Sequence, residues 1–179
     1  MEFKNYAEMV DYNIAHESTE VFGNFSTEHA SYIVTRFLEN AKKTVIILSG
    51  GFVDVTPTRG LCALLKQTAL RLVENDGSIR IITANGEKNS DIERIRDEIG
   101  CGKIEYIPAR YSGTTPLKHF MVIDGKMYRL ENAHETLSDG AELHAEVCCN
   151  GREKAAQLTE FFDRVWHLLK ESGKKYQEA

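Results

Sequence analysis

The stretch Thr115-Pro-Leu-Lys-His-Phe-Met-Val-Ile-Asp-Gly-Lys-Met-Tyr-Arg-Leu-Glu-Asn-Ala-His-Glu135 decides how this sequence of 179 residues is read. Residues His119 to Ile123 form a largely apolar run with β-branched members, which is typical of a strand. Asp124-Gly125 follows, and this dipeptide is the strongest short signal for a hairpin turn. The strand pattern then resumes from Met127 to Leu130. The stretch therefore predicts a β-hairpin.

Helical and strand patterns alternate before this hairpin. Apolar residues at helical spacing follow Ser26, and the continuous apolar run Thr44–Leu48 is typical of a strand buried on both faces. Further expected helices lie over 61–73 and 90–99, and a long helix ends the chain. Ser90 and Glu93 are expected to cap the helix over 90–99, and Gly100 to end it. Further expected strands lie over 79–83, 103–107 and 145–149. This order predicts an α/β fold, a layered α/β/α sandwich with a mixed central β-sheet.

Length and composition indicate a single domain over residues 1–179. Residues 1–25 are expected to be an extension packed on the domain, with a short strand at 21–23, and residues 171–179 to be a frayed tail. The sequence has 42% hydrophobic residues, with neither a membrane-spanning run nor a signal-peptide pattern, and we therefore expect a cytoplasmic protein. The four cysteines include no Cys-x-x-Cys pair, which favours reduced thiols.

The formal net charge of −5 disfavours non-specific binding to duplex DNA, although it leaves room for a local basic cleft. The side chains of His119, Glu131, His134 and His144 could supply metal ligands, but no metal-binding spacing joins them, so we expect neither a metal nor a cofactor. The turn Ser49-Gly50-Gly51 lacks the glycine pattern and the lysine of a nucleotide-binding loop and is interpreted as a simple turn.

The layout of the hairpin resembles the signature region of the phospholipase D-like superfamily. The motif of that family is His, any residue, Lys, four residues and Asp, closely followed by Gly-Ser-x-Asn. When Asp124 is taken as the family's Asp, the family's His falls on Leu117 and its Lys on His119. The Gly-Ser-x-Asn segment then falls on Glu131, Asn132, Ala133 and His134. The resemblance covers roughly residues 26–170 and implies a single-motif member with a degenerate motif.

In that family one His attacks phosphorus, a second His protonates the leaving oxygen, and Lys and Asn hold the phosphate oxygens. The resemblance implies His119 and His134 as catalytic candidates and Lys118, His119 and Asn132 as candidate phosphate ligands. Leu117 and His119 are expected to share the active face, with Lys118 on the other face, because neighbours alternate along a strand. The alternative for His119 is a neutral, hydrogen-bonded residue at the sheet edge. Asp124 and Gly125 are interpreted as the structural turn, with the carboxylate bonded to amides next to Gly125.

Short members of the family assemble their site across a homodimer, so the resemblance also implies a dimer. Since leucine cannot attack phosphorus, we expect a non-catalytic or weakly catalytic homodimer that binds a phosphate-bearing ligand, such as a nucleotide or nucleic acid, or a macromolecular partner. One alternative is an active phosphodiesterase or endonuclease that uses His119 from two subunits. A second alternative is a protein-binding regulator or inhibitor module. A positive pocket favours the ligand and an apolar patch favours a protein partner.

Overall fold

The computed structural model describes residues 4–50, 58–100, 102–110, 117–131 and 144–175. Five helices and seven strands lie in these ranges. The helices are α1 (Tyr6–Ala15), α2 (Thr27–Asn40), α3 (Thr58–Glu74), α4 (Ser90–Ile99) and α5 (Arg152–Lys175). The strands are β1 (Val21–Asn24), β2 (Thr44–Ser49), β3 (Ser78–Thr83), β4 (Ile104–Pro108), β5 (Phe120–Ile123), β6 (Met127–Glu131) and β7 (Ala145–Cys148).

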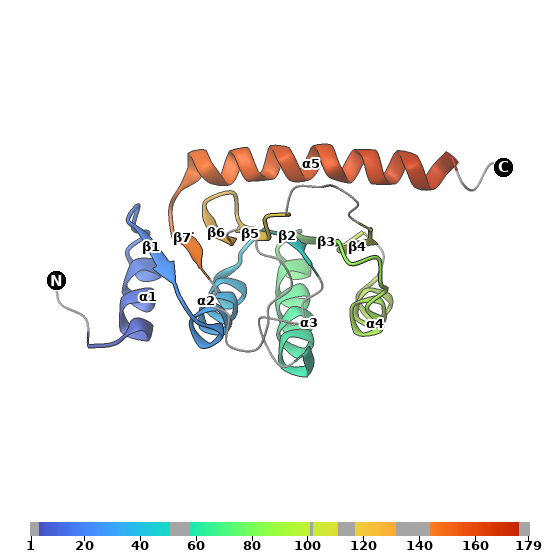
Figure 1. The fold of residues 1–179 in the computed structure, drawn as a ribbon. Helices are drawn as coiled ribbons and strands as arrows, with labels where there is room; N and C mark the ends of the chain where they lie inside the picture. The colour runs from blue at the N-terminus through green and yellow to red at the C-terminus, as the bar shows by residue number, and fades with distance from the viewer. Residues whose placement is uncertain (1–3, 51–57, 101, 111–116, 132–143, 176–179) are drawn as a thin grey trace.

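All seven strands form one mixed sheet, in the order β1-β7-β6-β5-β2-β3-β4. Strands β2, β3 and β4 run parallel, while the other neighbours pair antiparallel. Figure 1 shows α5 lying across one face of the sheet and α1 to α4 on the other face. The predicted α/β/α sandwich with a mixed sheet is confirmed, and β1 joins the six predicted central strand segments at one edge.

Strand alternation divides the core into two clusters. Val45 and Ile47 of β2 belong to the cluster that packs under α1 to α4, whereas Ile46 and Leu48 belong to the cluster under α5. All four side chains are buried, so β2 is covered on both faces, as its continuous apolar sequence predicts. The same alternation holds in β5, where Met121 lies with the first cluster and Phe120 with the second. This alternation determines on which face of the sheet each side chain of the candidate site lies.

Capping residues set the helix starts. Ser26 caps α2, because its hydroxyl oxygen accepts the amide hydrogen of His29 at 3.1 Å, as the sequence predicts. The expected cap of α4 is wrong by one residue: the cap is Asn89, and Ser90 is already helical. The Asn89 side-chain oxygen accepts from the amides of Asp91 and Ile92, both at 3.1 Å. Asn and Ser are about equally good caps, so the pattern alone does not choose between these neighbours.

The N-terminal segment is more ordered than its sequence pattern indicates. The predicted short strand exists as β1, and helix α1, which was not predicted, precedes it. The side chain of Val10 is fully buried in the cluster under α1 to α4. At the other end, α5 continues to Lys175, inside the segment for which the sequence predicts fraying. Among the described helices, none has the length and apolar character needed to cross a membrane.

The central hairpin turns where it was expected to turn. Asp124 and Gly125 have φ values of 53° and 62°, the positive values that a type I′ turn requires, and the Lys126 amide donates to the Ile123 carbonyl at 3.1 Å. The sequence predicts that the Asp124 carboxylate binds amides of its own turn, and this prediction is wrong. The carboxylate accepts from the backbone amides at 42, 43 and 44, at 2.9, 2.7 and 2.8 Å, and so attaches the turn to the start of β2.

Candidate functional site

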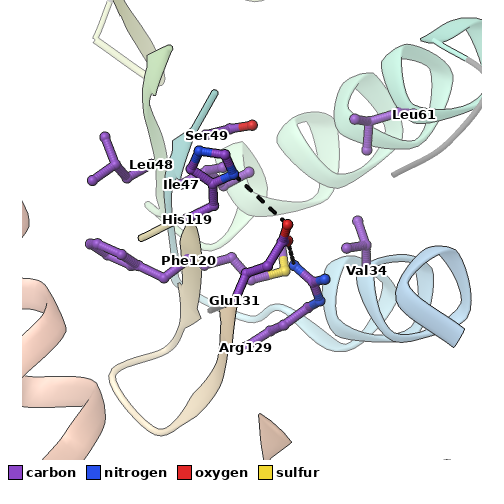
Figure 2. A pocket seen from close by; sticks show the side chains of 10 residues that line it. Val34, Ile47, Leu48, Ser49, Leu61, His119, Phe120, Arg129 and Glu131 are labelled. Atoms are coloured by element: carbon purple, nitrogen blue, oxygen red, sulfur yellow. Dashed lines mark hydrogen bonds and ion pairs between the residues drawn. The ribbon is translucent and has the colours of Figure 1, made fainter. Parts of the chain in front are cut away.

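The open end of the hairpin brings His119 between β2 and β6. The Glu131 amide donates to the His119 carbonyl at 2.8 Å, which extends the β5–β6 pairing by one residue. On the other side, β5 pairs with β2 up to Phe120 and Leu48, so that Ser49 is the next residue beside His119. Figure 2 shows the imidazole of His119 beside Ser49 and above the carboxylate of Glu131. Ser49 at the end of β2, His119 just before β5 and Glu131 at the end of β6 therefore lie close together.

A buried ion pair forms the polar side of the site. Arg129 and Glu131 are two residues apart in β6, so both side chains lie on the sheet face covered by α1 to α4. Nη1 of Arg129 donates to Oε2 of Glu131 at 2.6 Å, and Nε donates to the side-chain oxygen of Asn24 at 2.9 Å. The two side chains are 5% and 2% exposed. Since a buried charge is costly unless it is paired, each member of this pair depends on the other.

The ion pair reaches toward His119 without a close contact. Oε1 of Glu131 lies 3.9 Å from Nδ1 of His119, within range of an ion pair when the imidazole is protonated but beyond a hydrogen bond. Nη2 of Arg129 has no hydrogen-bond partner among the described residues. The group thus combines a fixed cation, a fixed anion and an imidazole whose side chain is 20% exposed.

These three polar side chains border a pocket of about 50 Å³. The other residues around it are mainly apolar and come from α2, α3, β2 and β5: Val34, Ile47, Leu48, Ser49, Leu61, Phe120 and Met121. Such a volume holds a few water molecules or one small polar group, and is too small for a nucleoside. The pocket is therefore suited to one end of a ligand.

Gly50 allows the imidazole to occupy its place. A Cβ atom at this position would lie 2.8 Å from Cε1 and 3.0 Å from Nε2 of His119, closer than real side chains approach. The turn after β2 was interpreted from sequence as a simple turn. In the structure the first glycine of this turn, Gly50, leaves room for the ring of His119, which any larger residue would displace.

The residues predicted for the site are only partly brought together. His119 borders the pocket, whereas Lys118 is exposed and is not among the pocket-lining residues. The expectation that Leu117 shares a face with His119 is wrong, because Leu117 packs against the cluster under α5. Strand β5 begins only at Phe120, so the alternation assumed from Asp124 does not extend back to Leu117. The candidates Asn132 and His134 lie outside the described residues.

Sequence reasoning did not identify the ion pair. Arg129 was not considered, and Glu131 was considered as a possible metal ligand and as the position of the motif's glycine, but not as part of an ion pair. A signal was present, because Arg and Glu occupy alternate positions in an otherwise apolar strand, which places two opposite charges on one face. Among the described residues, no group of three His, Cys, Asp or Glu side chains is arranged to hold a metal ion.

Ionisable groups elsewhere in the sheet are perturbed by burial. Burial raises the pKa of the Cys149 thiol to about 12, and the neighbouring Cys148 adds to the effect. Burial also raises the pKa of Tyr128, and the hydrogen bond that its hydroxyl donates to Glu146 raises it further. Neither side chain borders the pocket. These groups stay neutral at pH 7 and leave the pocket's charge to Arg129, Glu131 and His119.

No family model matches the sequence, and no curated protein matches it either. The backbone is nonetheless similar to several solved structures. TrmBL2, an archaeal chromatin protein whose structure shows a novel mode of DNA binding, aligns with a TM-score of 0.58 at 16% identity, over 89% of this chain and 58% of that one. This chain thus spans less than two thirds of the TrmBL2 chain.

Two bacterial proteins align over nearly their whole lengths. Nuc from Salmonella typhimurium, a phospholipase D family member, has a TM-score of 0.56 at 14% identity, over 83% of this chain and 94% of that chain. NucT from Helicobacter pylori has a TM-score of 0.55 at 12% identity, over 83% and 97% of the two chains. At such identities the likeness is one of fold.

Proposed function

This chain has the phospholipase D-like fold, and from that premise we propose that it is a binding domain with a degenerate catalytic motif. It holds a phosphate-bearing ligand in the pocket beside His119 and does not cleave it. The observation that carries the proposal is the position of Leu117. The residue that aligns with the family's nucleophile is a leucine, and its side chain packs under α5, on the opposite side of the sheet from the pocket.

The remaining groups are suited to holding a phosphate. Arginine is the side chain best matched to phosphate oxygens, and Arg129 borders the pocket with one nitrogen that lacks a partner among the described residues. His119 can donate a hydrogen bond from either ring nitrogen, depending on its tautomer. Because an imidazole at the position of the family's phosphate-binding Lys still donates a hydrogen bond, the site keeps oxygen binding after the nucleophile is lost.

The charge of the pocket favours a small anion over a polyanion. Arg129 and Glu131 compensate each other, so among the described residues that line the pocket a net positive charge requires protonation of His119. The chain as a whole carries a net charge of −5. Non-specific binding to a nucleic-acid backbone requires many unpaired Lys and Arg side chains, and this charge opposes it. A single phosphate group on a small ligand therefore fits the pocket better than a long duplex.

The assembly that we propose is a homodimer with His119 of each chain near the two-fold axis, as the family resemblance implies. Light scattering at tens of micromolar protein tests it directly. A dimer is expected, and a monomer at all accessible concentrations would remove the assembly from the proposal while leaving the pocket in each chain.

Two measurements test the function. Hydrolysis of bis-p-nitrophenyl phosphate should not exceed a control without protein, because covalent and acid–base steps each need a positioned imidazole and acid–base transfer alone contributes roughly 10²–10⁴-fold. Titration calorimetry should detect binding of inorganic phosphate. The His119→Ala variant should bind it about tenfold more weakly, and Lys118→Ala should bind it as the wild type does.

The outcome that would overturn the proposal is turnover. Hydrolysis that disappears in His119→Ala and survives in Lys118→Ala would establish the alternative, a phosphodiesterase that uses His119 from two subunits. The absence of phosphate binding in the folded wild-type protein would instead favour the protein-binding module. These three results differ in kind, so one preparation of the protein and its two variants distinguishes the three functions.

A further inference from the structure

We infer that Glu131 makes the pocket selective for a phosphate group that still carries a proton. The preferred ligand is then a terminal phosphomonoester, and phosphodiesters and sulfate are rejected. The inference rests on the proposed function, because it names the chemical class of the ligand that the same pocket holds. It goes further by assigning the selectivity to one residue, at the place where the family motif has glycine.

The carboxylate of Glu131 is a fixed part of the pocket. Its side chain is 2% exposed, and its Oε2 atom is held by Nη1 of Arg129 at 2.6 Å. The residue nevertheless borders the pocket, together with Arg129 and His119. Figure 2 shows the carboxylate standing between the imidazole and the guanidinium. An anion that enters the pocket cannot avoid this carboxylate.

Hydrogen-bond chemistry then decides which anion is accepted. An ionised carboxylate accepts hydrogen bonds and has none to donate. A phosphate oxygen without a proton is likewise only an acceptor, so placing it against Glu131 produces repulsion and an unsatisfied contact. A phosphomonoester loses its second proton with a pKa of about 6, so near neutral pH part of it retains a P–OH group. That hydroxyl donates to Glu131 while the other oxygens accept from Arg129 and His119.

Phosphodiesters and sulfate have no such hydroxyl near neutral pH. Both ester oxygens of a diester carry carbon, and its single acidic proton is lost at low pH. The size of the pocket acts in the same direction, because about 50 Å³ admits the end of a molecule more readily than the middle of a chain. Charge and size together therefore favour a terminal phosphate and oppose the internal phosphates of a nucleic acid.

The other described residues that line the pocket carry no charge. Helices α2 and α3 contribute Val34 and Leu61, and β2 contributes Ser49 besides its apolar residues. Strand β1 supplies Asn24, a neutral partner of Arg129. Among the described residues, the groups whose protonation affects binding are thus His119 and Glu131, together with the phosphate on the ligand.

The test compares methyl phosphate, dimethyl phosphate and sulfate by titration calorimetry on the full chain. At pH 6.5, methyl phosphate should bind at least tenfold more tightly than either of the others. Sulfate serves as an internal reference, because it keeps one charge state from pH 6 to 8. Changes in the protonation of the protein affect the binding of both ligands, so they cancel in the ratio of the two affinities. The ratio of methyl phosphate affinity to sulfate affinity should fall roughly fiftyfold over that range, following the second ionisation of the ester near 6.

The Glu131→Gln variant assigns the effect, since its amide can donate as well as accept. Its ratio of methyl phosphate to sulfate affinity should stay within threefold of one at every pH, whereas the control Glu105→Gln, which changes a carboxylate paired with Lys170, should match the wild type. Should Glu131→Gln fail to fold, the wild-type ratio and its pH dependence still decide. Equal binding of sulfate and methyl phosphate would overturn this inference alone. No binding of any of the three would refute the proposed function as well.

Discussion

The two ends of the central hairpin differ in how they are held. At the turn, the carboxylate of Asp124 accepts hydrogen bonds from three backbone amides, those of residues 42, 43 and 44, at the start of β2. At the open end, His119 is placed by strand pairing and by the absence of a side chain at Gly50, and Glu131 is placed by Arg129. In the motif alignment on which the proposed function rests, the position at the turn keeps its residue and the positions at the open end do not. Under that proposal, the fold is kept while the chemistry of the same hairpin is lost.

The largest effect should come from breaking the ion pair at the open end. Arg129→Met leaves the carboxylate of Glu131 buried without its partner, and the free energy of unfolding should fall by about 3–5 kcal/mol in urea denaturation at pH 7. The double variant Arg129→Met with Glu131→Leu should recover at least half of this loss, because no charge is then buried. A loss below about 1 kcal/mol in the single variant would show that solvent reaches Glu131.

A smaller loss is expected at the turn. Asp124→Ala removes the acceptor of three amides, and the free energy of unfolding should fall by about 2–3 kcal/mol. Asp76→Ala is the matched control: Asp76 has the same φ of 53°, but its exposed carboxylate pairs with the Lys103 ammonium and accepts from no backbone amide among the described residues. The control should lose about 1 kcal/mol or less. Equal losses would mean that the backbone conformation, and not the amide bonds, makes Asp124 important.

Gly50→Ala should alter the site more than the fold. The new methyl group would displace the His119 ring, so phosphate binding should weaken about tenfold, while the free energy of unfolding falls by only about 1 kcal/mol. Gly60→Ala is the control, because an added Cβ there meets nothing within 4 Å and lies in helix α3. It should leave binding unchanged and slightly raise stability. Unchanged binding in Gly50→Ala would show that the position of the imidazole does not matter.

The smallest effect at neutral pH concerns Cys149, whose raised pKa makes it a reporter of the core beside the hairpin. Its pKa in the folded state is about 12, against an ordinary value of 9.0. Its contribution to stability is therefore complete below pH 9 and is lost as the pH rises toward 12. Urea unfolding should give a falling free energy over that range in the wild type and a shallower fall in Cys149→Ala. Rapid alkylation of native Cys149 at pH 7.5 would contradict the burial of its thiol.

Much of the fold could be predicted because its signals are local. The apolar run at 44–48, the Asp124-Gly125 turn and the stop at Gly100 each reflect a physical constraint within a few residues. Helix α1 was missed because the side chains of Tyr6–Ala15 give only a weak apolar stripe, and its burial depends on contacts with α2. Leu117 was placed on the wrong face because the strand was assumed to begin before Phe120.

The site was less predictable because its contacts join distant parts of the chain. Arg129 donates a hydrogen bond to Asn24, 105 residues away in sequence, and Gly50 lies against His119. Neither partner can be read from spacing, since each depends on which strands become neighbours in the sheet. The roles of Asn132 and His134 stay predictions, because both lie outside the described residues.

Because the first strand pairs with the last, β1 is synthesised well before its partner in the sheet. Strand β1 ends at Asn24, but within the described sheet it pairs with β7 alone, at residues 145–148. At about 5–20 residues per second, a ribosome needs roughly 6–25 s to synthesise the intervening chain. During that interval the edge of β1 lacks this partner. Asn24 is synthesised long before Arg129, but β1 can join the sheet only after β7 exists, so the contact between Asn24 and Arg129 is not fixed until that strand has been made.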